Sequence, residues 1–206
     1  MILYCVRHGE TEFNAVGRIQ GQADSRLSEL GKRQCEAIAQ RLATQPIEAV
    51  YSSTLRRAID SAQCIAQRLG LEVRIDPRLM EINAGIFQQL VWEQIEQRHP
   101  VEAAAWKSQD PDYRIPNGES RGDVMVRARA ALEAIREASH RQAVIVAHGG
   151  LLSAALKVLL EIPAKLNPFS FYNGSISKLQ WDGQVKLLTL NQIDHLRGLE
   201  GGGGDL

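Results

Sequence analysis

The stretch Ile2-Leu3-Tyr4-Cys5-Val6-Arg7-His8-Gly9 decides the class of fold. An apolar run that stops at a charged residue is typical of a short strand inside a sheet. A second run, Ala143-Val144-Ile145-Val146-Ala147, is also apolar and continues as His148-Gly149-Gly150 into an apolar helical pattern. Two buried strands that both end in histidine and glycine are therefore predicted, far apart in the sequence.

Strand and helix patterns alternate outward from these two runs. Ser28 and Ser120 are candidate N-caps, because each precedes a helical apolar pattern. In chain order we expect strands at 2–6, 49–51, 73–75, 143–147, 175–181 and 185–190, with helices at 28–42, 58–69, 120–135 and 151–160 between them. This alternation predicts an α/β fold, a three-layer α/β/α sandwich with a mostly parallel central sheet. Residues 76–117 are less regular and are expected to form a short, mainly helical insertion over the active site.

The length of 206 residues fits one domain, assigned to 1–200, and a glycine-rich tail at 201–206 that we expect to be flexible. Lysine plus arginine equals aspartate plus glutamate, at 24 each. This balance gives no reason to expect a nucleic acid or an anionic membrane as a partner. A local group of arginines must then bind any anion. We expect the chain to be a monomer or a homodimer.

Three cysteines, Cys5, Cys35 and Cys64, lie within apolar patterns. An odd number without a C-x-x-C spacing favours buried free thiols. Free thiols fit a cytoplasmic protein better than a secreted one. No segment approaches the roughly 18 apolar residues of a membrane span, and the N-terminus has no basic region typical of a signal peptide.

The residues that could bind a ligand or take part in a reaction lie at the ends of three predicted strands. Ligands bind beyond the carboxyl ends of the strands in open α/β sheets, and His8 and His148 both take that position. The glycines beside them would leave room for a bulky anion. Arg56 and Arg57 follow the second strand at the same edge. With Arg7 they supply guanidinium groups, which match phosphate oxygens in a bidentate manner. The pattern therefore favours a site for a phosphoryl group.

Each of these features also has a plainer interpretation. A single histidine beside glycine is often structural, and an arginine pair at a helix start is often solvated surface. Metal binding is disfavoured, because neither strand-end histidine belongs to an H-x-x-x-H or H-x-x-E-H set and no aspartate cluster accompanies them. We therefore expect no metal site. His99, His140 and His195 stand in polar surroundings and are expected at the surface, with the role of His195 left open.

Several ordered blocks of sequence stand out across residues 1–190. They are Arg7-His8-Gly9-Glu10-Thr11 with Asn14, Gly17-Arg18-Ile19-Gln20-Gly21, Asp24 with Leu27-Ser28 and Gly31, Ser53-Thr54-Leu55-Arg56-Arg57-Ala58, Leu79-Met80-Glu81, Gly118-Glu119-Ser120 and Val146-Ala147-His148-Gly149-Gly150. Together these blocks resemble the histidine phosphatase superfamily, which includes the cofactor-dependent phosphoglycerate mutases. Two further segments, 114–120 and 173–177, resemble its small bacterial, phosphoglycerate mutase-like phosphatase branch.

The resemblance implies a role for each matching residue. His8 would be the nucleophile that is phosphorylated, and Glu81 the general acid and base. Attack needs a neutral imidazole, which histidine mostly is at pH 7, and flanking arginines would favour it further. The other catalytic residues would be Arg7, Arg57 and His148, which hold the phosphoryl oxygens. The remaining phosphate and substrate contacts would come from Asn14, Gln20, Gly21, Gly149 and Glu119.

The resemblance implies a metal-independent phosphatase that acts on a small phosphomonoester. The insertion after Glu81 is short, whereas the known mutases of this type carry a longer one. The alternative is a phosphoglycerate mutase that uses 2,3-bisphosphoglycerate; otherwise no cofactor is expected. A non-catalytic regulator that binds a phosphorylated ligand fits less well, because such proteins usually lose the nucleophile or the acid.

The resemblance leaves the substrate open among phosphoserine, sugar phosphates, phosphoglycerates and α-ribazole phosphate. Ala84 stands where the phosphoserine phosphatases carry a histidine, which weakens phosphoserine. Residues 85–89 depart from the family's commoner aromatic-Glu-Gly pattern and predict an unusual pocket. The segment Ile193-Asp194-His195-Leu196 resembles a C-terminal segment that closes over the substrate in some members.

Overall fold

A six-stranded sheet forms the centre of the computed structural model, which describes residues 1–199. The strand order is β3-β2-β4-β1-β5-β6. Strands β3, β2, β4 and β1 are parallel, and β5 and β6 are antiparallel additions at one edge. The predicted mostly parallel sheet is thus confirmed. The strands are β1 (Ile2–Arg7), β2 (Ala49–Ser52), β3 (Val73–Ile75), β4 (Gln142–Ala147), β5 (Ile176–Asp182) and β6 (Gln184–Gln192). The predicted tail at 201–206 lies outside the described residues, as does residue 200.

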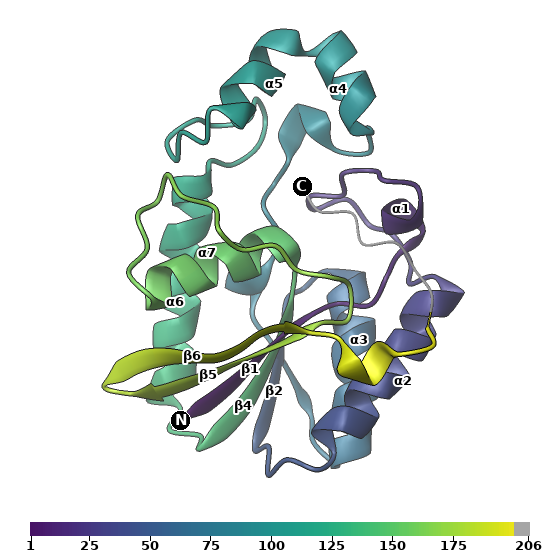
Figure 1. Cartoon of the computed structure of the whole chain (residues 1–206), viewed down its shortest axis with the longest axis vertical. Helices are drawn as coiled ribbons and strands as arrows, with labels where there is room; N and C mark the ends of the chain where they lie inside the picture. Colours follow the sequence, from purple (N-terminus) through teal and green to yellow (C-terminus); the bar gives the residue numbers. More distant parts are fainter. Residues whose placement is uncertain (200–206) are drawn as a thin grey trace.

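Helices cover both faces of this sheet, as the sandwich prediction requires (Figure 1). Helices α2 (Glu29–Leu42) and α3 (Arg56–Leu69) share one apolar core with the sheet. Helices α6 (Arg121–Glu137) and α7 (Gly149–Leu159) share the other. The remaining helical elements are α1 (Glu12–Ala15), η1 (Pro77–Leu79), η2 (Gly85–Phe87), α4 (Trp92–Arg98), α5 (Pro100–Lys107) and η3 (Asp194–Leu196).

Strand β1 shows why its sequence is a continuous apolar run. Its side chains alternate between the two faces of the sheet. Leu3 and Cys5 belong to the core under α6 and α7, whereas Tyr4 and Val6 belong to the core under α2 and α3. All four are buried, because each face of the sheet is covered by helices. A parallel sheet covered on both sides needs apolar residues at every position of its central strands.

The predicted N-caps hold the ends of two helices in place. The Ser28 hydroxyl accepts from the Gly31 N–H at 3.0 Å, and the Ser120 hydroxyl accepts from the Asp123 N–H at 3.1 Å. Helix α1 was not expected in the polar stretch after β1. Its first turn is fixed by Thr11 and Asn14, which bond to each other's backbone N–H groups.

The insertion is mainly helical, as predicted, and Figure 1 shows α4 and α5 lying beyond the carboxyl ends of the parallel strands. It is anchored by buried apolar side chains, among them Phe87, Ile95 and Ala103. One cysteine prediction was wrong: Cys5 and Cys35 are buried, but Cys64 of α3 is only half-buried and packs against the edge of the apolar core. None of the helices within residues 1–199 has the length and apolar character to cross a membrane.

Candidate active site

The register of β1 against β4 brings the two strand-end histidines together. Arg7 pairs with Ala147, so the next residues, His8 and His148, leave the sheet side by side. The backbone N–H of His8 donates to the Ala147 carbonyl at 3.0 Å, and the centroids of the two imidazole rings are 5.1 Å apart. The two strand-end histidines therefore lie beside each other at the carboxyl edge of the sheet.

His8 is held as a neutral imidazole. Its Nδ1 lies 2.7 Å from the Gly9 carbonyl oxygen, which can only accept, so Nδ1 carries the proton and Nε2 keeps a lone pair. Burial and the positive charges of Arg57 and Arg7 lower the pKa of His8 well below its usual range. A buried, neutral imidazole with Nε2 unprotonated is the form that a nucleophile needs.

Arg57 fixes the loop that faces His8. Its side chain is 1% exposed, and burial lowers its pKa to about 10. Nη1 donates to the Ala23 carbonyl at 2.9 Å and Nη2 donates to the Gly21 carbonyl at 2.6 Å. A guanidinium has five N–H donors, so Arg57 can hold this loop and still donate to a bound anion.

His148 lies behind Arg57 and does not line the cavity. Its Nδ1 accepts from Arg57 Nε at 3.2 Å, which leaves the ring proton on Nε2 to donate to the Ser53 hydroxyl at 2.7 Å. Burial and the charge on Arg57 lower the pKa of His148 well below its usual range. In this arrangement His148 orients Arg57, and a direct contact with a phosphoryl oxygen stays a prediction. The sequence interpretation assigned no role to Ser53, although this residue directly follows strand β2, which lies beside β4.

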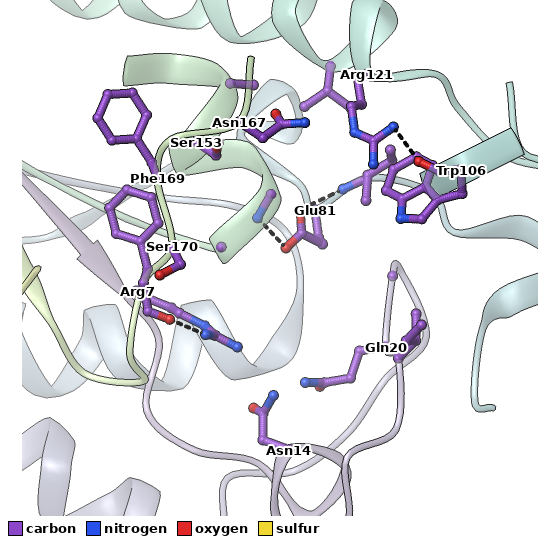
Figure 2. A pocket seen from close by; sticks show the side chains of 18 of the residues that line it. Arg7, Asn14, Gln20, Glu81, Trp106, Arg121, Ser153, Asn167, Phe169 and Ser170 are labelled. Carbon is purple, nitrogen blue, oxygen red and sulfur yellow. Dashed lines mark hydrogen bonds between the residues drawn. The ribbon is translucent and has the colours of Figure 1, made fainter. Parts of the chain in front are cut away.

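The other predicted binding residues line the same cavity as His8. Arg7 is 6% exposed and its Nη1 donates to the Phe171 carbonyl. The side-chain oxygen of Asn14 accepts from the backbone N–H of Thr11, which leaves the amide nitrogen toward the cavity (Figure 2). Gln20 is nearly buried, and Gly21 has a φ of 53° that favours glycine.

Glu81 lies between the two ends of the cavity, opposite the strand ends (Figure 2). Its Oε1 accepts from the backbone N–H groups of Ile82 at 2.8 Å and Leu151 at 3.0 Å. Its Oε2 accepts from the Gly150 N–H at 3.0 Å. The first N–H groups of α7 have no partner within the helix, and this carboxylate accepts from them. Its negative charge also interacts favourably with the positive, N-terminal end of the helix dipole.

The structure explains the glycines around the site differently from the sequence prediction, which was that they leave room for an anion. A Cβ on Gly150 would lie 2.6 Å from Glu81 Oε1, so the bare backbone lets the carboxylate reach the helix. A Cβ on Gly9 would lie 2.5 Å from the Gly31 carbonyl, so Gly9 allows α2 to pack close to the strand end. A Cβ on Gly149 would make only an ordinary contact, 3.7 Å from Arg7. Room for an anion therefore does not explain Gly9.

Glu119 does not line the cavity, contrary to the sequence expectation. Its carboxylate pairs with Arg127 Nε at 2.9 Å and accepts from the Asn83 N–H at 2.8 Å. Arg127 in turn donates to the carbonyls of Met80 and Glu81. The pair thus fixes the loop that carries the Glu81 carboxylate. Arg127 was missed, because nothing in the sequence of a long helix indicates which of its arginines faces this loop.

The cavity has a volume of about 640 Å³ and extends from the strand ends to a second region that the sequence did not reveal. We call this region the roof; its residues are Trp92, Trp106, Arg121, Lys157, Asn167 and Phe169. Figure 2 shows Arg121 and Asn167 at one end of the cavity and Arg7 and Asn14 at the other.

The C-terminal segment 193–196 does not close over the cavity. It packs against α2, and His195 Nε2 lies 2.9 Å from the Gly174 carbonyl oxygen. His99, His140 and His195 are each half-buried. Within residues 1–199, no three His, Cys, Asp or Glu side chains are grouped so that they could hold a metal ion.

The combination of a strand-end histidine pair, buried arginines and an opposed glutamate agrees with the sequence family that matches this chain. A model of the histidine phosphatase superfamily, branch 1, matches residues 3–193. The chain therefore belongs to the histidine phosphatase superfamily.

Curated relatives carry two kinds of name. A glucosyl-3-phosphoglycerate phosphatase of Mycobacterium tuberculosis is 37% identical over 190 residues, which cover 88% of this chain and 85% of that protein. A probable phosphoglycerate mutase of Proteus mirabilis is 39% identical over 205 residues, with 94% of each chain covered. Among solved structures, a mycobacterial glucosyl-3-phosphoglycerate phosphatase in complex with VO3 superposes with a TM-score of 0.86 and 36% identity, covering 93% of this chain and 99% of that one.

Proposed function

We propose that this protein is a metal-independent phosphatase that hydrolyses a small phosphomonoester through a phosphohistidine on His8. The observation that carries the proposal is the neutral state of His8, whose Nδ1 proton is committed to the Gly9 carbonyl and whose ring borders the same cavity as Glu81. Family membership supports it, as do relatives named as phosphatases.

In the first step, Nε2 of His8 attacks the phosphorus and the bond between phosphorus and the ester oxygen breaks. The Glu81 carboxyl gives its proton to the departing alkoxide, which leaves as an alcohol. This step requires the Glu81 carboxyl to carry a proton when the phosphate ester is bound.

In the second step, water attacks the phosphorus of phospho-His8. The Glu81 carboxylate removes a proton from that water, the bond between phosphorus and Nε2 breaks, and inorganic phosphate leaves. His8 returns to its neutral form with the proton still on Nδ1. The two steps together consume one ester and one water and restore both residues.

The phosphoryl oxygens would be held at the strand-end side of the cavity. Arg7 and Arg57 supply guanidinium donors, and charge on the equatorial oxygens of the transition state is what such fixed donors stabilise. The same part of the cavity is lined by Asn14, Gln20, Gly21 and Gly149, the last of which offers its backbone N–H. His148 would act by orienting Arg57.

The alternative function is a phosphoglycerate mutase, because some relatives carry that name. A mutase would return the phosphoryl group of phospho-His8 to a second hydroxyl and would need 2,3-bisphosphoglycerate as a primer. The short insertion after Glu81 favours hydrolysis, since the known mutases of this type carry a longer one.

A metal-free turnover screen over small phosphate esters tests the proposal. The panel begins with glucosyl-3-phosphoglycerate, since relatives are named for it, and includes 3-phosphoglycerate and α-ribazole phosphate. We expect inorganic phosphate to be released in the presence of EDTA and without 2,3-bisphosphoglycerate. Isomerisation of 3-phosphoglycerate that requires the bisphosphate would establish the mutase. The absence of both activities would favour a non-catalytic binding module. Activity that returns only when a divalent ion is added would contradict metal independence.

We further propose that the protein works in the cytoplasm on small molecules, as a monomer or a homodimer. Free thiols at Cys5 and Cys35 support a reducing compartment. The balanced charge supports a small-molecule substrate rather than a nucleic acid or a membrane.

A further inference from the structure

The roof of the cavity contains two cationic side chains at a distance from the phosphoryl end. Arg121 begins α6, and Lys157 lies in α7 with 2% of its surface exposed. Both line the cavity, with Asn167 beside them. Figure 2 shows the Arg121 guanidinium and the Asn167 amide on the far side of Glu81 from Arg7.

Neither roof cation forms an ion pair with a carboxylate of residues 1–199. Lys157 Nζ donates only to neutral oxygens, the Ala164 carbonyl at 3.0 Å and Asn167 Oδ1 at 2.7 Å. Burial lowers the pKa of Lys157, and the charge of Arg121 lowers it further. A buried lysine and a half-buried arginine that repel each other and have no carboxylate partner are costly unless an anion joins them.

The two cations are also held in place. The Arg121 guanidinium lies 3.3 Å from the centroid of the Trp106 ring, and its Nη1 donates to the Trp106 carbonyl at 3.2 Å. Stacking fixes the plane of the guanidinium and leaves other N–H groups for the cavity. By contrast, Lys107 at the cavity edge pairs with Glu96, and Arg127 of the same helix α6 pairs with Glu119.

We propose that Arg121 and Lys157 form a subsite for a second anionic group of the substrate, a carboxylate or a second phosphate on the leaving group. The proposal rests on the proposed function, because it assumes that the phosphoryl group occupies the strand-end side of the cavity. The substrate class is then a phosphomonoester whose alcohol carries a negative charge at its other end, with Glu81 between the two anions.

The test compares matched pairs of esters in wild-type protein. One series is the phosphates of ω-hydroxy carboxylic acids of increasing chain length, each against its carboxamide. The other is alkanediol bisphosphates, each against the monophosphate. We expect at one chain length a preference of about tenfold or more in kcat/KM for the anionic ester, since a hydrogen bond between charged groups is worth that much. Which series shows the preference identifies the anion.

Arg121→Met tests the residue. We expect it to reduce the preference for the anionic ester by about tenfold while kcat/KM for the carboxamide changes by less than about threefold. Arg129→Met is the matched control, because Arg129 is an exposed cation of the same helix outside the cavity. Lys157→Met is a second variant whose folding is checked first by circular dichroism, since this lysine is buried.

Three outcomes would overturn the subsite. The first is that wild-type protein hydrolyses both members of every pair equally well. The second is that Arg121→Met lowers turnover of the anionic ester and of its matched partner by the same factor. The third is that Arg129→Met loses the preference for the anionic ester as much as Arg121→Met does. Hydrolysis of none of the esters would instead contradict the proposed function. Binding titrations of the His8→Ala variant with the same pairs of esters distinguish failure of the subsite from failure of the proposed function. Tighter binding of the anionic ester would support the subsite without any turnover.

Discussion

The phosphoryl end and the roof of the cavity are built in opposite ways. The phosphoryl end consists of residues at the ends of adjacent parallel strands, and its polar groups bond to one another, as Arg57, His148 and Ser53 do. The roof consists of residues from the insertion, from helices α6 and α7 and from the segment between α7 and β5. Its cations Arg121 and Lys157 have no carboxylate partner within residues 1–199. The chemistry is therefore fixed by the sheet, whereas the choice of substrate depends on what is packed over it.

The largest effect that separates the two regions is expected at Glu81. Glu81→Gln removes the proton donor, so kcat for an alkyl phosphate should fall by about 10² to 10⁴. An aryl phosphate, whose leaving group needs no proton, should lose much less in the phosphorylation step. Steady-state and single-turnover rates for both esters measure this contrast.

Arg129→Met, an exposed substitution on α6, serves as the control for the Glu81 experiment. An equal loss of phosphorylation rate for alkyl and aryl esters would show that Glu81 is not the general acid.

A smaller effect is expected from the glycines at the start of α7. Gly150→Ala places a Cβ 2.6 Å from Glu81 Oε1, so the carboxylate must move, and we expect kcat to fall by about 10². Gly149→Ala makes only an ordinary contact at 3.7 Å and should cost less than about fivefold. Kinetics of the two variants with one ester compare them directly. Equal losses would contradict the placement of Glu81 at this helix end.

The smallest effect is on stability, and it distinguishes the phosphoryl end from the roof. The pKa values of His8 and His148 lie well below the usual histidine value in the folded protein. As pH falls below about 6.5, the unfolded chain binds these protons and the folded protein does not. Each histidine should therefore lower the free energy of unfolding by up to about 1.4 kcal/mol per pH unit.

Denaturant titrations between neutral and mildly acidic pH measure this loss of stability. The roof cations should not contribute, since they stay charged over that range. His148→Gln should flatten the dependence on pH, and an unchanged slope would show that His148 is not held neutral.

Much of the phosphoryl end could be predicted from the sequence. The apolar runs fix two neighbouring buried strands, and residues that directly follow such strands meet at one edge of the sheet. His8, Arg7, Arg57 and His148 were found for this reason. Even so, the sequence did not predict the direction of the His148 side chain. It turns toward Arg57 and Ser53 and does not face the cavity.

The roof and the supports of Glu81 could not be predicted. Arg127 and Arg121 are two of several arginines in one helix, and only tertiary packing decides which face a neighbouring loop or the cavity. The segment 193–196 resembles a closing segment, yet its Leu196 is buried against α2. Contacts between elements that are distant in sequence decide all three cases, and local patterns do not report them.

The most direct test of the central claim is to trap the phosphoenzyme. Wild-type protein is mixed with substrate, quenched with alkali within milliseconds, digested and analysed by mass spectrometry. We predict one phosphoryl group on the peptide that contains His8, stable in alkali, lost in acid, and absent from the His8→Ala variant. A phosphoryl group at another residue, or equal labelling of His8→Ala, would contradict the claim that His8 is the nucleophile.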